Sequence, residues 1–152
     1  FIPHTQDDVD AVGGFTHAHE ISKIGCRLYL TAAEQILKGE SIVFPKDIKY
    51  YRIDNLKNVN RDEIKSSGYV VDTLEAALWC FYTTNSYRDC VLKAVNLGGD
   101  TDTIAAVAGG LAGLFYGCDG KNGIPEEWIA QIAKKEWIKE LCDKAESQFY
   151  LP

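Results

Sequence analysis

Three candidate oxygen ligands lie close together just before the most apolar segment of this chain. Asp100, Asp102 and Thr103 follow the glycine pair Gly98 and Gly99 and precede the run Ile-Ala-Ala-Val-Ala. Glycine adopts positive φ freely and lets the backbone approach a ligand closely, so Gly99 is a candidate contact to a substrate. Carboxylate and hydroxyl oxygens suit hard cations such as Mg²⁺, Mn²⁺ or Ca²⁺ rather than zinc or copper. The pattern predicts a metal site with Asp100, Asp102 and Thr103 as ligands.

The same spacing has other interpretations. Asp and Thr are ordinary helix caps, and acids in a first turn interact favourably with the helix dipole. An EF-hand loop needs further ligands and a glycine at its sixth position, where this chain has Ala105. A dehalogenase-type Asp-x-Asp-x-Thr follows a buried strand, whereas residue 104 is Ile and residues 87–97 are expected to be helical. The Asp-x-Asp of nucleotide-sugar transferases stays open as an alternative and would require a parallel sheet.

The wider sequence resembles the ADP-ribosylglycohydrolase family, which includes the dinitrogenase reductase-activating glycohydrolases. The resemblance extends over about residues 14–146. Five segments carry it in the family's order: Thr-His-Ala-His at 16–19, Gly-Tyr-Val-Val-Asp-Thr-Leu-Glu-Ala-Ala-Leu-Trp at 68–79, Gly-Gly-Asp-Thr-Asp-Thr-Ile-Ala at 98–105, Ala-Gly-Gly-Leu-Ala-Gly at 108–113 and Ile-Pro-Glu-Glu-Trp at 124–128. The acidic segment is specific, and the others are weak singly.

The resemblance implies hydrolysis of the glycosidic bond that joins ADP-ribose to a protein side chain, such as arginine, or of a related conjugate. Two Mg²⁺ or Mn²⁺ ions would lie between Asp100, Asp102, Thr103 and a second acidic motif of the family. As expected catalytic residues, Asp100 and Asp102 would position metal, and one could accept a proton from water. His17 and Tyr69 match positions near bound ADP-ribose, where an imidazole could hydrogen-bond an oxygen and a ring could stack. A non-catalytic relative that serves as a binding or structural protein is the alternative.

The ends of the chain suggest a piece of a longer protein. It begins with Phe1 and contains no Met, although removal of an initiator Met generally needs a small second residue. The family's domains are longer, and the half with the other acidic motif is the expected partner of this chain. Thr5-Gln6-Asp7-Asp8 resembles that motif, but it lies directly before the Thr-His segment. We interpret Asp7 and Asp8 as solvated surface charges.

Composition argues against several classes of partner. The formal net charge of −6 does not suit nucleic acid, which is bound through clustered Lys and Arg. The longest apolar run, 104–117, is shorter than the roughly 20 residues that span a bilayer. No basic amphipathic stretch suggests a membrane surface. The five cysteines contain no Cys-x-x-Cys pair, so we expect buried, reduced thiols in a cytoplasmic protein.

The elements that must position these residues are predicted to be helices. Apolar residues recur at helical spacing, which predicts an all-α fold, a compact orthogonal bundle in which residues 1–152 form the C-terminal part of one domain. The first expected helix covers 16–38, with Thr16 as its cap and Gly39 at its end, and a polar connection over 40–67 with a short helix near 61–65 follows it. The next helix runs from Asp72 to about Tyr82 and begins with a capping box formed with Glu75. A helix capped by Ser86, a central helix over 102–116 and a helical region after Pro125, broken near 130, complete the chain.

The central helix is apolar on every side, which predicts burial in the core of the bundle. Its many small residues would let neighbouring helices approach closely, and a rigid helix would hold metal ligands in place. Trp79 and Trp128 are expected to be core aromatics, and His19 is expected at the surface.

Overall fold

The computed structural model describes residues 4–46 and 48–149. Over these ranges the chain forms helices and no β-strand, which confirms the all-α class and argues against a transferase built on a parallel sheet. The elements are α1 (Gln6–His17), α2 (Glu20–Leu37), the 3-10 turns η1 (Leu56–Asn58) and η2 (Arg61–Glu63), α3 (Val70–Tyr82), α4 (Tyr87–Val95), α5 (Thr101–Tyr116), α6 (Glu126–Ala130) and α7 (Lys135–Phe149).

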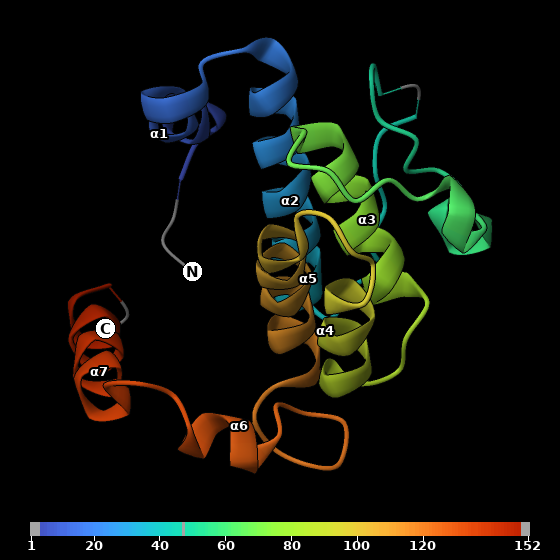
Figure 1. The fold of residues 1–152 in the computed structure, drawn as a ribbon. Coiled ribbons are helices and arrows are strands. Elements are labelled where there is room, and N and C mark those ends of the chain that lie inside the picture. Colours follow the sequence, from blue (N-terminus) through green and yellow to red (C-terminus); the bar gives the residue numbers. More distant parts are fainter. Residues whose placement is uncertain (1–3, 47, 150–152) are drawn as a thin grey trace.

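The core lies around α3, which packs between α2, α4 and α5 (Figure 1). Almost every side chain of α3 from Val71 to Phe81 is buried. Leu78 of α3 and Ile104 and Leu111 of α5 are fully buried, and each such side chain contributes about 1.5–3 kcal/mol relative to an exposed one. The helix that follows the acidic loop is therefore anchored in the best-packed part of the molecule.

Burial of α5 on every side, however, is wrong for the part of the chain that the structure describes. Ile104, Ala108, Leu111 and Ala112 face the core, but Phe115 remains 58% exposed. Ala106, Gly110 and Leu114 are also exposed on the side away from the core. The reason is geometric, because α2, α3 and α4 cover only part of the circumference of α5.

The segment predicted as one helix over 16–38 is two helices. Thr16 lies in the last turn of α1 rather than at a cap. The helix is interrupted at Ala18. His19 then caps α2, because its Nδ1 accepts a hydrogen bond from the Ile21 amide at 3.3 Å. Gly39 follows the end of α2 at φ +71°, as expected.

The acidic residues near the beginning of the described chain belong to a helix start. Thr5 caps α1 in a capping box, in which the Asp8 carboxylate accepts a hydrogen bond from the Thr5 amide at 2.8 Å. Asp7 and Asp8 are both exposed, so their interpretation as surface charges is confirmed.

The start of α3 differs from the predicted capping box. Tyr69 is the N-cap, and the Asp72 carboxylate accepts a hydrogen bond from Ser67 Oγ at 2.7 Å. Glu75 does not cap the helix, because its buried side chain is bound to Arg52 at 2.8 Å. Ser86, by contrast, caps α4 as predicted, and its hydroxyl accepts a hydrogen bond from the Asp89 amide at 3.0 Å.

The C-terminal helices confirm the break predicted near residue 130. α6 ends at Ala130, and α7 stands apart from the bundle (Figure 1). Trp137, Ile138 and Leu141 on α7 are 57%, 42% and 45% exposed, so their apolar stripe is not packed.

Of the two tryptophans expected in the core, Trp79 is 5% exposed and donates its indole N–H to the Val59 carbonyl at 2.9 Å, which confirms that prediction. Trp128 is only half-buried and meets the Tyr87 ring edge-on.

The cysteines are unpaired, but their burial varies. Cys80 and Cys90 are buried as expected, Cys26 is half-buried, and Cys118 and Cys142 are exposed, against expectation. Both exposed thiols lie in the C-terminal segment that packs least against the bundle.

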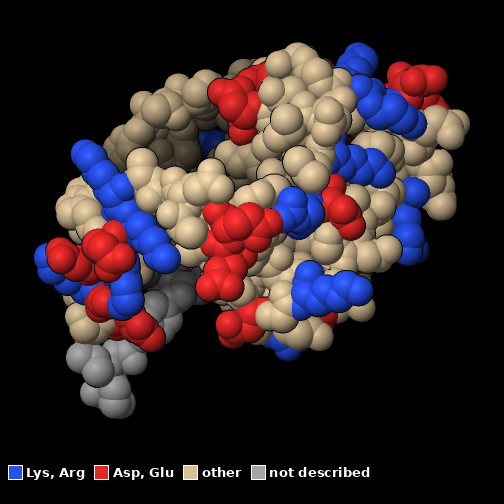
Figure 2. Space-filling model, turned by 60° about the horizontal axis from the view of Figure 1, so that its bottom comes forward, with Lys and Arg blue, Asp and Glu red and all other residues tan. Residues whose placement is uncertain are grey.

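Surface charges of both signs are interspersed on the face shown in Figure 2, without a continuous basic patch there. None of the described helices is long and apolar enough to cross a membrane.

Candidate functional site: an acidic loop beside a cavity

The acidic loop turns sharply into α5. Gly98 and Gly99 both lie in the left-handed region, at φ +82° and +67°, which glycine adopts without strain. Asp100 is the N-cap residue of α5, yet its side chain makes no capping bond to a backbone amide. Its Oδ1 instead accepts a hydrogen bond from Thr103 Oγ1 at 2.9 Å. The ordinary-cap interpretation therefore does not describe the Asp100 side chain.

Asp102 lies next to Asp100 and is exposed. A hydrogen bond with the Asp100 carboxyl, followed by bonds from the backbone amides of Thr103 and Asp102, lowers the pKa of Asp102 below its ordinary value. These bonds favour the charged form of the Asp102 carboxyl.

A cavity of about 640 Å³ opens beside this loop. It brings together His17 from the end of α1, Tyr69 from the start of α3 and Thr103 from α5. Gly68 also lines it, and a Cβ on Gly68 would lie 3.0 Å from Asp100 Oδ2. The candidate residues of three distant segments thus share one cavity or border it.

Gly99, the remaining candidate for a contact to substrate, lies outside the cavity lining. A Cβ on Gly99 would overlap the Ser66 carbonyl oxygen, so its close approach is to the protein's own backbone.

The histidines at the cavity come from the break between α1 and α2. His17 is exposed, and its Nδ1 lies 3.0 Å from Thr16 Oγ1. His19 also lines the cavity, together with Ile21 and Ser22 of α2. His19 is exposed, as expected, but its position at the cavity depends on the break between α1 and α2, which the prediction of one continuous helix did not include.

The chain also matches known proteins. Residues 3–151 match the family model described as ADP-ribosylglycohydrolase. The chain belongs to this family. It is 35% identical over 159 aligned positions to the ADP-ribosylarginine hydrolase Tri1 of Serratia proteamaculans, covering 99% of this chain and 42% of that protein. It is 30% identical over 122 positions to the ADP-ribosyl-[dinitrogen reductase] glycohydrolase of Rhodospirillum rubrum, covering 79% and 40%. Human ADP-ribosylhydrolase ARH3 is 34% identical over 86 positions, covering 47% and 23%.

This ADP-ribosylglycohydrolase-family chain spans about two fifths of the length of the Serratia and Rhodospirillum proteins, 42% and 40%. Within residues 4–46 and 48–149, no three or more His, Cys, Asp or Glu side chains gather as they would around a metal ion. The donor set of Asp100, Asp102 and Thr103 has the hard-oxygen chemistry that Mg²⁺ and Mn²⁺ prefer. It fits part of a metal site.

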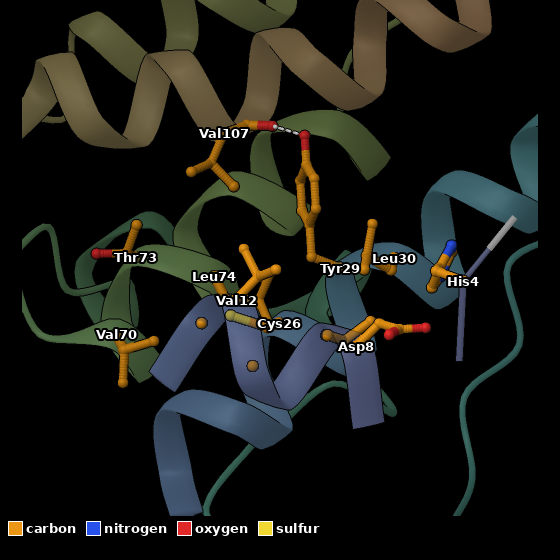
Figure 3. A pocket seen from close by; sticks show the side chains of 13 residues that line it. His4, Asp8, Val12, Cys26, Tyr29, Leu30, Val70, Thr73, Leu74 and Val107 are labelled. Carbon is orange, nitrogen blue, oxygen red and sulfur yellow. Dashed lines mark hydrogen bonds between the residues drawn. The ribbon is translucent and has the colours of Figure 1, made fainter. Parts of the chain in front are cut away.

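A second cavity of about 480 Å³ lies between α1, α2, α3 and α5 and is almost entirely apolar. Figure 3 shows Val12 of α1, Cys26 of α2 and Leu74 of α3 gathered beside Tyr29, whose hydroxyl donates to the Val107 carbonyl at 3.4 Å. Such a lining does not suit a charged diphosphate, because burying charge without partners is costly. The cavity beside the acidic loop differs in that the polar side chains of His17, Tyr69 and Thr103 are among its lining residues.

Proposed function

We propose that this chain is part of an ADP-ribosylglycohydrolase that hydrolyses the glycosidic bond between ADP-ribose and a protein side chain, with arginine as the first candidate. The observation that carries the proposal is the shared cavity of His17, Tyr69 and Thr103. The Asp100 carboxylate borders that cavity through its contact with Gly68. The arginine assignment is supported by the names of the relatives, which include ADP-ribosylarginine hydrolase Tri1.

Asp100, Asp102 and Thr103 are the residues that would hold Mg²⁺ or Mn²⁺, two ions in the complete site. Bound cations would orient water and offset charge that develops at the sugar. Asp100 and Asp102 are ligands first, and one of them can also accept a proton from the attacking water.

The other residues of the cavity hold the substrate. The His17 imidazole lies at the cavity wall as a hydrogen-bonding group for a ribose or phosphate oxygen. Tyr69 is 51% exposed there, so its ring is available to stack on the sugar or base. Gly99 is exposed although it does not line the cavity, and in this proposal its backbone adds a contact to the substrate.

The partners are an ADP-ribosylated protein and the rest of the same domain. The chain covers 42% of the Tri1 protein from Serratia, so a further segment supplies the remaining metal ligands in our proposal. The exposed apolar side of α5, at Leu114 and Phe115, is a surface that this segment would cover. A cytoplasmic location agrees with cysteines that form no disulfide among the described residues.

The test is release of ADP-ribose from ADP-ribosylarginine by the complete domain, with and without Mg²⁺ or Mn²⁺. We expect Asp100→Asn and Asp102→Asn each to lower kcat by roughly a hundredfold or more, as loss of a main electrostatic group commonly does. Asp143→Asn, which removes an exposed carboxylate on α7, is the matched control. Metal binding without turnover of any ADP-ribosylated substrate would contradict hydrolysis.

A binding or structural protein without catalysis is the alternative. In that case calorimetry would detect ADP-ribose binding by the complete domain, and no product would form in the presence of either cation.

A further inference from the structure

Residues of the segment 61–68 form hydrogen bonds with the backbone of the acidic loop. Arg61 Nη2 donates a hydrogen bond to the Leu97 carbonyl at 2.5 Å. Ser66 Oγ donates to the Gly98 carbonyl, and the Ser66 carbonyl accepts the Asp100 amide at 3.3 Å. Three backbone groups over four successive residues of the loop are thus bound by two residues of another segment.

The contact between the two segments is close as well as hydrogen-bonded. Gly99 leaves room for the Ser66 carbonyl oxygen, which a Cβ would overlap. Gly68 leaves room for the Asp100 carboxylate, since a Cβ there would lie 3.0 Å from Oδ2. The orientation of Asp100 therefore depends on where the segment 61–68 lies.

This segment is itself fixed to the core. Ile64 is 4% exposed, and its carbonyl accepts a bond from Arg61 Nη1 at 3.3 Å. The Ser67 carbonyl accepts a bond from Thr73 Oγ1 of the buried helix α3 at 3.1 Å. A path of hydrogen bonds thus runs from the core through segment 61–68 to the backbone that carries the carboxylates.

We propose that Arg61 and Ser66 are positioning residues that hold the Asp100 and Asp102 carboxylates in the geometry required for a divalent cation. The inference rests on the proposed function, in which these carboxylates bind metal. Two consecutive glycines have the largest conformational freedom of any residue pair, so the loop needs external bonds to keep its ligands in place. Groups that orient metal ligands typically change metal affinity by 10–100-fold when removed.

The experiment is a titration of the complete domain with Mn²⁺ alone. Binding is measured by calorimetry and by the decrease in the electron paramagnetic resonance signal of free Mn²⁺. We expect Ser66→Ala to weaken Mn²⁺ binding by about tenfold or more, and Ser66→Thr, which keeps the hydroxyl, to restore most of it. Arg61→Met is expected to weaken Mn²⁺ binding in the same direction, because the Leu97 carbonyl loses its donor.

Matched controls separate positioning from stability. Ser86→Ala removes the cap at the end of α4 that is opposite the loop, and it should lower the thermal midpoint without changing the Mn²⁺ affinity. Arg88→Met removes an exposed arginine that pairs with Glu127 and should also leave that affinity unchanged. All titrations are made well below the thermal midpoint of each variant.

The outcomes distinguish this inference from the proposed function. Unchanged Mn²⁺ affinity in Ser66→Ala and Arg61→Met, with affinity lost in Asp100→Asn, would overturn the positioning role and leave the metal ligands standing. If Ser86→Ala lost as much Mn²⁺ affinity as Ser66→Ala, the loss would be explained by lower stability of the fold, and this would also overturn the positioning role. No Mn²⁺ binding by the unmodified domain would overturn both the ligand assignment and the positioning role.

Discussion

The buried Glu75 carboxylate accepts hydrogen bonds from three nitrogens of Arg52. The backbone amide lies 2.6 Å from Oε1, and Nε and Nη2 lie 3.0 and 2.8 Å from Oε2. Glu75 is 3% exposed, whereas the Arg52 side chain is 55% exposed. This pair joins the long connection between α2 and α3 to the core helix α3, and it raises the pKa of the Arg52 guanidinium.

Removing the arginine should destabilise the fold. In Arg52→Met the Glu75 carboxylate keeps the backbone amide but loses its counter-charge in a buried position. Breaking a buried pair costs about 3–5 kcal/mol, and we expect roughly 2–3 kcal/mol here because Arg52 is half exposed. Urea unfolding followed by circular dichroism measures the loss, with the exposed Lys139–Asp143 pair on α7 as control through Lys139→Met. A loss no larger than in the control would contradict this role of Arg52.

The two loop glycines should respond differently to alanine. Gly98→Ala meets nothing within 4 Å and adds only the left-handed strain, about 1–2 kcal/mol. Gly99→Ala carries the same kind of strain and places its Cβ on the Ser66 carbonyl oxygen, so the loop must move. We expect Gly99→Ala to be the less stable variant in thermal unfolding and to lose Mn²⁺ binding, while Gly98→Ala retains it. Equal behaviour of the two variants would show that the loop does not depend on its contact with Ser66.

Thiol reactivity should follow burial. Burial raises the pKa of Cys80 to about 12 and also raises the pKa of Cys90. At pH 8 a thiol of that pKa is ionised to roughly one part in ten thousand, and the thiolate is the reactive form. We expect Cys80 and Cys90 to react with a disulfide reagent only after unfolding in urea, as mass spectrometry of the labelled protein would show. Rapid labelling of either thiol in the folded protein would mean that α3 and α4 open readily.

Tyr69 should contribute to binding of ADP-ribose rather than to stability. Its ring is exposed at the cavity, so Tyr69→Ala is expected to weaken ADP-ribose binding by about 1 kcal/mol, or roughly fivefold, through lost stacking. Tyr69→Phe keeps the ring and should bind nearly as well. Calorimetry with ADP-ribose measures both, and Tyr50→Ala, an exposed tyrosine outside the cavity, is the control. Unchanged affinity in Tyr69→Ala would remove this residue from the site.

Much of the local structure was predictable because its causes are local. Ser86 caps α4 and Gly39 ends α2 as their residue types indicate, since a cap needs only a side-chain oxygen and a left-handed position needs only a missing Cβ. The acidic loop was found in the same way, from the types and spacing of its residues. The errors have long-range causes. The sequence predicts Glu75 as part of a cap, but its partner Arg52 lies 23 positions earlier in the chain. It predicts one helix over 16–38, but the chain forms two, because no local pattern marked the break before α2.

The amino-acid sequence alone determined the helical class, the family and the oxygen donors at the start of α5, because these depend on residue types and short spacings. Only the tertiary structure decided that His17, Tyr69 and Thr103 line one cavity and that Arg61 and Ser66 bind the backbone of the acidic loop. Those contacts join residues that are far apart along the chain. Their geometry depends on how α1, α3 and α5 pack around a shared core, which no local sequence pattern specifies.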